Sequence, residues 1–387
     1  MFESFFRPVI DIAADVLGGV AELINPVDGD LHPAPADGRV VLPDDLFAQP
    51  GAQTEWWYYT GHCRSNKDRE FGFELVFFKR RTDKDKISQF PVSILANPMY
   101  FAHFAISDIS EKRFRYDHKR SFNRPLEPAA SASINACDVR LGDWSLREVA
   151  GKHILHATLP DGLVFDAVLE SSKPIAPNGD GGNGLSIKSG GSSKHFSFTR
   201  MNVSGQLINN SSLETFKGTA WMDREYGAWE QAGGWDWFSI QFDDETELMI
   251  YQFKDPSGGM MGESTGTYVD RDGNCTYLKR KDFDITTAGK WTSRVTGAEY
   301  PSEWIVAVPS LDIDIKIEAL LADQELDTRG TTMIVYWEGA CSVTGSKSGS
   351  PVTGRAYVEL VGYDRSHESV GVADFILGKP LSDLLPF

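Results

Sequence analysis

The sequence predicts an all-β fold, built from antiparallel strands that form barrels or sandwiches in two domains, with one helix at the N-terminus. Three observations support this prediction. The chain has 387 residues, of which 41% are hydrophobic and 12% aromatic, enough for two large ring-rich cores. Short strand patterns and turn signals recur roughly every 8 to 15 residues. Beyond residue 25 there is no long helical period.

The N-terminal segment differs from the rest of the chain. Residues 2–24 carry apolar side chains at three- and four-residue spacing and predict an amphipathic helix. It is expected to pack across the body of the protein, and the alternatives are a helix that covers a pocket or lies on a membrane. Residues 25–50 are rich in Pro and Asp and predict a linker or wrapped loop. We therefore expect a helix and linker over 1–44, a first β-barrel domain over 45–215 and a second over 216–380.

Several strands can be placed from their patterns. Residues 71–78, FGFELVFF, predict a buried strand, and residues 311–318, LDIDIKIE, alternate as a half-exposed strand does. Residues 237–253, WFSIQFDDETELMIYQF, predict a hairpin with its turn at Asp243–Thr246. Residues 178–195 are Gly-rich and polar, and they predict a loop or flap, because no strand–GxxxxGK[ST]–helix context surrounds them.

Charge and cysteine content exclude some classes of function. The net charge of −17 repels phosphate backbones, so nucleic acid is not an expected partner. The four scattered cysteines form no CxxC and predict neither a zinc site nor a disulfide framework, which favours a reducing compartment. The N-terminus lacks the basic start of a signal peptide. We expect a cytoplasmic protein without a cofactor, with peripheral membrane contact through residues 2–24 as an option.

Two clusters combine acids with large rings. The first is GAQTEWWYYTGHC, residues 51–63, where Glu55 precedes two Trp and two Tyr residues. The second is GTAWMDREYGAWEQAGGWDWFSIQFDD, residues 218–244, which holds Asp223 and Glu225. Each Trp N–H and Tyr O–H needs a polar partner when it is buried. Such clusters are typical of ring-lined binding sites and of hydrogen-bonded barrel ends.

The order of several motifs resembles a known family. The runs EWWYYTGH, FGFELVFF, FAHFAISD, KGTAWMDREYG, GWDWFSIQFDDETELMIYQF, ADQELD and YWEGACSVTG follow one another between residues 45 and 375. They resemble the AttH-like proteins, often described as secreted hydrolases, which belong with the carotenoid 1,2-hydratases (hydroxyneurosporene synthases) in a lipocalin-like superfamily. The resemblance implies two tandem lipocalin-like β-barrel domains. This chain departs from the family pattern in two ways. It lacks the export signal that many AttH-like relatives carry. It also has Glu55 in its first motif, whereas the hydratases have a shorter motif without that Glu.

The resemblance also implies a chemistry. The hydratase relatives add water across an isolated isoprenoid double bond, which requires a strong proton donor and rings that stabilise a carbocation. Burial among rings would keep a carboxylic acid protonated. We predict that Asp223 is the acid and that Glu225 is its partner or positions the water molecule. Glu55 would contribute a further carboxyl group from the other domain. The predicted substrate-binding residues are Trp57, Tyr58, Tyr59, His103, Trp221, Tyr226, Trp235, Asp236 and Trp237. The same site would also suit isomerisation or cyclisation of a large isoprenoid or polyketide-like substrate.

Structural interpretations stand beside each of these assignments. Glu55 would serve equally well as an acceptor for indole N–H groups, and Asp223 or Glu225 would serve as salt-bridge partners of Arg224 or Arg80. His103 suits a core position. A metal site is disfavoured by the dispersed spacing, and a serine hydrolase is disfavoured because no GxSxG occurs. The rival class of function is a lipocalin-like carrier of a hydrophobic small molecule, and a hydrolase is the third.

Two geometric predictions follow from the clusters. The first is that they meet in space, because each half of the chain carries one cluster near its start. The second is that residues 55–60 form a strand whose side chains divide by parity. Glu55, Trp57 and Tyr59 should share one face, while Trp56, Tyr58 and Thr60 share the other, with neither face left in solvent.

Overall fold

The computed structural model describes residues 39–364 apart from 88–89, 95–96, 124, 126, 180, 189, 210–211, 230–232 and 256. The helix predicted over 2–24 lies outside the described residues. Within them the only helical elements are 3-10 turns, which are η1 (Asp44–Leu46), η2 (Val92–Ile94), η3 (Arg280–Asp282) and η4 (Pro309–Leu311). The predicted all-β class is therefore confirmed. No helix in the described part of the chain has the length and apolar character needed to cross a membrane.

The first sheet has 13 strands, in the order β6-β5-β2-β1-β15-β14-β11-β10-β9-β8-β7, with β12 and β13 paired to β14. All of these pairings are antiparallel. The strands are β1 (Thr54–Ser65), β2 (Glu70–Arg80), β5 (Met99–Asp108), β6 (Arg113–Ser121), β7 (Ala130–Ala132), β8 (Asp138–Leu141), β9 (Trp144–Val149), β10 (Lys152–Thr158), β11 (Leu163–Ser171), β12 (Ala176–Pro177), β13 (Leu185–Lys188), β14 (Gly191–Asn209) and β15 (Ser212–Ala228).

The second sheet has 10 strands, in the order β19-β18-β17-β16-β25-β24-β22-β21-β20, with β23 paired to β24. They are β16 (Gly234–Phe242), β17 (Glu247–Lys254), β18 (Thr265–Val269), β19 (Cys275–Lys279), β20 (Asp284–Thr292), β21 (Glu299–Val308), β22 (Ile313–Ala319), β23 (Glu325–Asp327), β24 (Val335–Lys347) and β25 (Ser350–Val361). The predicted hairpin of residues 237–253 is present as β16 and β17. A separate pair joins β3 (Lys86–Ile87) to β4 (Phe90–Pro91).

The boundary between the sheets differs from the predicted domain division. A division at residues 215/216 falls inside β15, whose residues pair with β1 and β14 of the first sheet. The midpoint of the chain therefore lies within one long hairpin. The chain passes from the first sheet to the second between Ala228 and Gly234.

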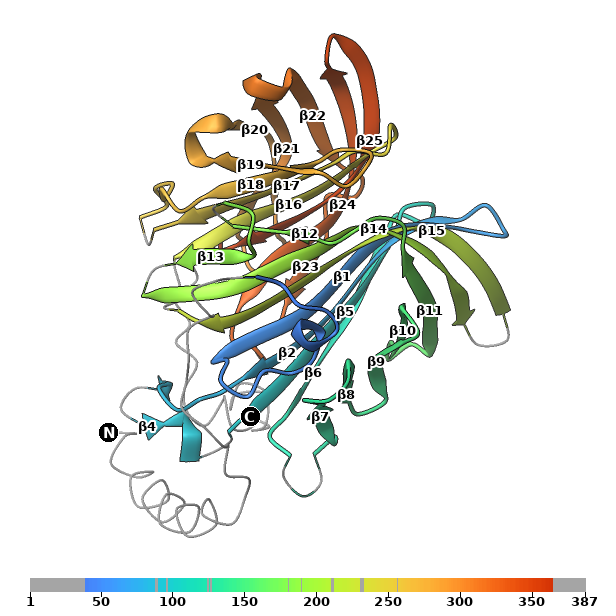
Figure 1. Cartoon of the computed structure of the whole chain (residues 1–387). Coiled ribbons are helices and arrows are strands. Elements are labelled where there is room, and N and C mark those ends of the chain that lie inside the picture. Colours follow the sequence, from blue (N-terminus) through green and yellow to red (C-terminus); the bar gives the residue numbers. More distant parts are fainter. Residues whose placement is uncertain are drawn as a thin grey trace.

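Each sheet curls around its own core, and Figure 1 shows the two curled sheets lying side by side. The first core includes Trp57, Phe73, Phe104, Trp144 and Phe165. The second core includes Phe238, Ile250, Trp304, Ile315 and Trp337. A third buried cluster combines residues of both sheets, namely Tyr58, Val76, Trp221, Trp237, Met249, Tyr251, Phe253, Ala340 and Tyr357. The sheets therefore pack against each other through the side chains that point away from the two barrel cores.

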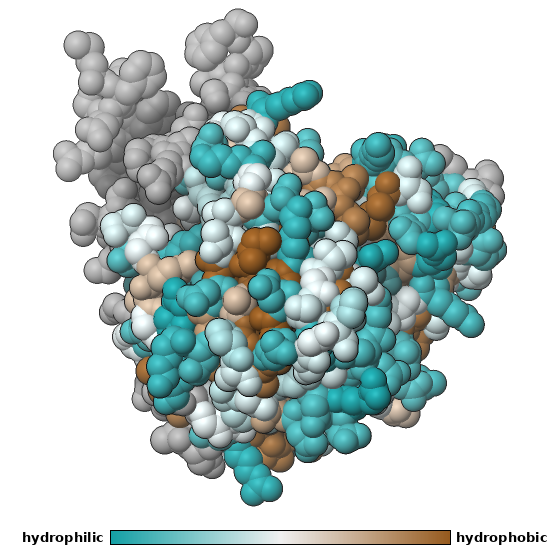
Figure 2. Space-filling model, turned by 90° about the horizontal axis from the view of Figure 1, so that it is seen from above, coloured by the Kyte–Doolittle hydropathy of each residue, from teal (hydrophilic) through white to brown (hydrophobic). Residues whose placement is uncertain are grey.

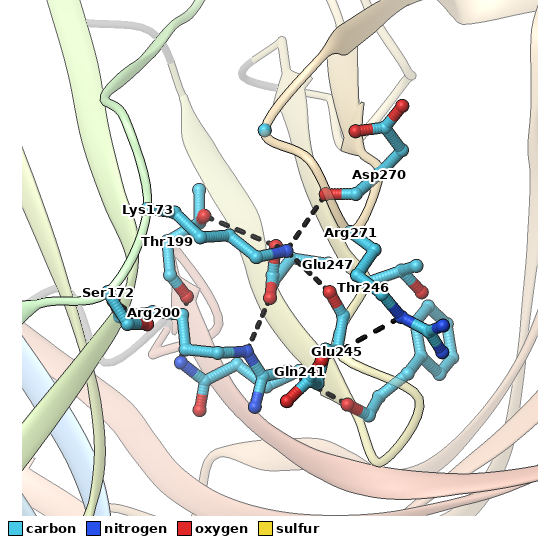
Figure 3. A network of polar contacts seen from close by, with 12 residues as sticks. Ser172, Lys173, Thr199, Arg200, Gln241, Glu245, Thr246, Glu247, Asp270 and Arg271 are labelled. Carbon is cyan, nitrogen blue, oxygen red and sulfur yellow. Dashed lines mark hydrogen bonds and ion pairs between the residues drawn. The ribbon is translucent and has the colours of Figure 1, made fainter.

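An ion-paired contact ties the sheets together at one place. Glu247 of β17 is fully buried and pairs with Lys173 at 2.9 Å and with Arg200 of β14 at 2.5 Å. Figure 3 shows Lys173, Thr199 and Arg200 converging on this carboxylate from the first sheet. Arg200 belongs to β14 of the first sheet and Lys173 to the segment between β11 and β12, so the contact links the first barrel to β17 of the second.

The view from above, in Figure 2, shows a mostly hydrophilic surface with apolar residues gathered in a central hollow.

The parity prediction for β1 is confirmed. Trp57 and Tyr59 belong to the first barrel core, and Glu55 is fully buried on the same side. Tyr58 belongs to the cluster between the sheets, with Trp56 packed against it. The two sequence clusters also meet, since β1 pairs with β15 and places Tyr58 opposite Asp223. They meet inside one sheet rather than at a junction of two domains.

Candidate active site

A cavity of about 490 Å³ lies between the two sheets. Large rings from both of them form most of its wall, namely Trp56, Phe78, Trp229, Trp235, Tyr251 and Phe253. A volume of this size and an aromatic lining are typical of sites for drug-sized apolar ligands. Three groups of polar side chains in this wall are described below, and Arg80, Lys84, Asp85 and Glu263 also line the cavity.

The first polar group is centred on Asp223. This carboxylate accepts hydrogen bonds from Trp221 Nε1 at 2.6 Å and from the hydroxyl of Ser197. His195 Nε2 lies 3.0 Å from its second oxygen. Burial alone would lower the pKa of His195, but the nearby carboxylates Glu225 and Asp223 outweigh it and raise that pKa. Three donors therefore surround Asp223, and the raised pKa of His195 favours the charged form of its imidazole.

The second polar group is centred on Glu225. Its carboxylate contacts the Ser193 hydroxyl and forms an ion pair with Lys188 of β13. The Lys188 ammonium also lies 4.3 Å from the centre of the Trp229 ring and 5.2 Å from that of Tyr251. Burial lowers the pKa of Lys188, while Glu225 opposes that shift. Glu225 is thus a structural counter-ion for a cation held among rings.

The third polar group is Glu359 of β25, on the opposite sheet from Asp223. It lines the cavity and is only half-buried. Its one hydrogen bond within the described residues comes from Trp235 Nε1 at 2.8 Å, and no cation pairs with it there. Burial raises the pKa of Glu359 to about 7, and the charges of Asp223 and Glu225 add to that rise against the Trp235 hydrogen bond. Glu359 is therefore a carboxylic acid that retains its proton near neutral pH.

Glu55 is not among the residues that line the cavity, so the structure does not bring it together with Asp223 and Glu225 there. Its oxygens pair with Lys79 Nζ at 2.7 Å and Arg224 Nη2 at 2.6 Å, and one also accepts the backbone N–H of Gln49 at 3.0 Å. The physical reason is parity, because Glu55 is three residues from Tyr58 along β1 and points to the barrel core. Glu55 therefore has a structural position, but its partners are two cations and a backbone N–H rather than the indole N–H groups of the structural alternative.

Several predicted substrate-binding residues lie away from the cavity for the same reason. Trp57 and Tyr59 are in the first barrel core, and Tyr226 binds Asp45 through its hydroxyl at 2.6 Å. Asp236 faces the second barrel, where Lys254 pairs with it at 2.6 Å. By contrast, the residues of the prediction that do line the cavity are Tyr58, His103, Trp235, Trp237, Asp223 and Glu225. Trp221 is behind this wall and supports Asp223.

Sequence reasoning missed His195, Lys188 and Glu359. His195 and Lys188 lie at the end of the Gly-rich segment, where the residue pattern predicts only a loop or flap. Glu359 stands in YVELV, where it is the one acid in an apolar strand, and that interruption is a signal that could have found it. Trp56 and Trp229 were also missed as wall residues, although both belong to the two quoted clusters.

Comparisons with known proteins agree with this architecture. A family model described as AttH-like matches residues 33–363. A solved AttH-type structure from Nitrosomonas europaea is 28% identical, has a TM-score of 0.74, and aligns over 86% of this chain and 100% of its own. Kievitone hydratase from Nectria haematococca is 16% identical with a TM-score of 0.65, over 86% of this chain and 95% of its own. A search of curated proteins found no match.

Proposed function

Because the chain belongs to the AttH-like family, we propose that the cavity between its sheets is the active site of a hydratase-, isomerase- or cyclase-type enzyme. Its substrate is a large apolar molecule, isoprenoid or polyketide-like, and the first step is protonation by a carboxylic acid. The observation that carries this proposal is Glu359, a proton-retaining carboxyl group that faces a ring-lined cavity with no cation paired to it among the described residues. A carrier needs no such group, because apolar walls alone hold an apolar ligand.

The fold comparison supports an enzyme of this class. One of the similar solved structures is, by its name, a hydratase. Protonation of a carbon–carbon double bond needs an acid, and the cation that results is stabilised by ring faces by roughly 0.5–2 kcal/mol each when water is excluded. In hydration, a water molecule then bonds to the cationic carbon and returns one proton to the Glu359 carboxylate. The acid is restored, and the net change is addition of one water molecule.

Asp223 and Glu225 have a tuning role in this scheme. Both are carboxylates with bound cations or donors, and their negative charges favour the neutral form of Glu359. Asp223 also holds His195, whose imidazole faces the same cavity. The environments of the three acids therefore differ, because Asp223 and Glu225 have donors or a cation beside them, while Glu359 has a raised pKa and no paired cation among the described residues.

The test uses the ligand that co-purifies with the protein, identified by mass spectrometry, and incubates it with the enzyme in D₂O. Protonation at carbon introduces a C–D bond whether the product is a hydrate, an isomer or a ring. Glu359→Gln should reduce deuterium incorporation by roughly 10²–10⁴-fold, because an amide cannot donate the proton. Glu263→Gln is the control, since Glu263 also lines the cavity but is exposed.

Asp223→Asn separates the tuning role from the predicted role as acid. If Asp223 tunes Glu359, the variant keeps turnover at low pH, while the alkaline limb of the pH profile moves below about 7. Complete loss of turnover at every pH in a folded Asp223→Asn protein would return the acid role to Asp223. Unchanged incorporation by Glu359→Gln would overturn the proposal.

A further inference from the structure

Behind Glu359, away from the cavity, two more carboxyl groups lie between the sheets. Glu338 of β24 is the direct neighbour of Glu359 on the adjacent strand, in register with it. Side chains so paired have Cβ atoms roughly 4.5–5.5 Å apart. Glu74 of β2 approaches from the first sheet, and both Glu338 and Glu74 are fully buried. Three acids from three strands thus share one dry region.

Hydroxyl groups rather than cations surround these acids. Tyr58 donates to Glu338 Oε1 at 2.7 Å, and Tyr336 donates to Glu74 Oε1 at 3.4 Å. The second oxygens of Glu338 and Glu74 have no hydrogen-bond partner among the described residues. No group of three or more His, Cys, Asp or Glu side chains there is arranged to hold a metal ion. Buried carboxylates without counter-charges are strongly disfavoured, so these groups must hold protons.

The other ionisable groups near these acids do not alter this conclusion. Burial raises the pKa of Glu74 to about 8 and that of Glu338 well above its ordinary value, and in each case Glu359 adds to the rise. His103 Nδ1 lies 2.7 Å from the Tyr336 hydroxyl, and burial lowers the pKa of His103, so that its imidazole is neutral. The charges that act on Glu359 itself are also carboxylates, namely Asp223, Glu225 and Asp236.

We propose that Glu338 and Glu74 form a proton reservoir for Glu359, so that the cavity acid regains a proton from inside the protein while an apolar substrate excludes water. In this step the O–H bond of the Glu338 carboxylic acid breaks and a new O–H bond forms on the Glu359 carboxylate. Glu338 then holds the negative charge, which the Tyr58 hydroxyl stabilises by its hydrogen bond. The proton that the substrate later releases is accepted at Glu359, which passes one proton back to the Glu338 carboxylate, and the original protonation is restored.

The role of the reservoir in catalysis rests on the proposed function, but the protons held by Glu338, Glu74 and Glu359 can be measured without a substrate. The infrared carbonyl stretch of protonated carboxyl groups reports them directly in the whole protein at pH 7. Glu338→Gln and Glu74→Gln should each remove intensity from this band, while Glu318→Gln should not, because 46% of the Glu318 side chain is accessible and Lys316 pairs with it. Tyr58→Phe should shift the band of Glu338 without removing it, and it serves as the milder variant if a Gln variant fails to fold.

A second measurement tests the coupling to the cavity. In Glu359→Gln the bands of Glu338 and Glu74 should disappear at a lower pH than in the wild type, because the negative charge of Glu359 that raises the pKa of both acids has been replaced by a neutral amide. A wild-type protein without protonated carboxyl groups at pH 7 would overturn the reservoir, as would titrations of Glu338 and Glu74 that Glu359→Gln does not move. Loss of deuterium transfer with the infrared pattern intact would instead reject the proposed function alone.

Discussion

At the scale of single residues, position on a strand decides what an acid does. Glu55 and Asp223 lie on paired strands, yet they face opposite sides of the same sheet. Glu55 enters the barrel core and needs two cations, while Asp223 enters the space between the sheets and binds His195. Strand parity alone therefore makes Glu55 a buried ion-paired acid and places Asp223 in the wall of the cavity.

The buried ion pairs of Glu55 give a stability prediction. Glu55→Gln keeps the shape of the side chain but leaves Lys79 and Arg224 as buried cations without their counter-charge. Breaking a buried pair in this way should lower the free energy of unfolding by roughly 3–5 kcal/mol. Chemical denaturation measures it, with Arg64→Gln as the control, because Arg64 pairs with Asp68 at the surface and should leave stability nearly unchanged. A stable Glu55→Gln protein that loses turnover would show that Glu55 takes part in the chemistry.

At the scale of elements, the close approach of β2 to the second sheet shapes the region between the barrels. Gly72 of β2 leaves no room for a side chain, because a Cβ there would lie 2.9 Å from the Cβ of Ala340 and closer still to the Tyr357 hydroxyl. Both contacts belong to the other sheet, on β24 and β25. The two barrels can pack this tightly only where one strand presents glycine.

Gly72→Ala should therefore push the sheets apart. Overpacking of this kind lowers the free energy of unfolding by roughly 1–3 kcal/mol. The matched control is Gly262→Ala, because a Cβ at Gly262 would meet nothing within 4 Å. Thermal unfolding of the two variants measures the difference. Equal stability of the two variants would mean that the sheets adjust to a Cβ at position 72 without loss of stability, so that close packing does not require glycine there.

At the scale of the whole molecule, the buried acids link folding to pH. The pKa of Glu74 is about 8 in the folded protein and that of Glu359 about 7, against an ordinary value of 4.5. A carboxyl group with a raised folded pKa contributes stability below the unfolded pKa, and that contribution is lost as pH rises through the folded value. These acids therefore lower the free energy of unfolding as pH rises, and we expect a net fall between pH 7 and pH 8, where Glu74 titrates.

The buried histidines act in the opposite direction on the acid side. His62 and His153 have pKa values of about 4, so they remove stability as pH falls from 6.5 towards 4. Comparing pH 7 with pH 9 avoids this region. Denaturation curves at these two values should show a loss in the wild-type protein and a smaller loss in Glu74→Gln. A variant with the same loss as the wild type would place the titrating group elsewhere.

The local pattern of the sequence was sufficient for much of this fold. Alternating apolar residues predicted the strands, and the period of two predicted which side chains of residues 55–60 share a face. The two ring clusters were expected to meet, and β1 and β15 do pair. These features depend on neighbours along the chain or on one strand pairing, so residue order alone determines them.

The tertiary structure decided which residues face the cavity and which of them hold protons. Strand parity assigns two faces, but only the curvature of each sheet determines which face closes a barrel core and which meets the other sheet. Glu359 keeps its proton because of its burial and the charges of Asp223 and Glu225, which come from the opposite sheet more than a hundred residues away in the chain. A pKa depends on burial and on charges nearby in space, and neither is written in the local sequence.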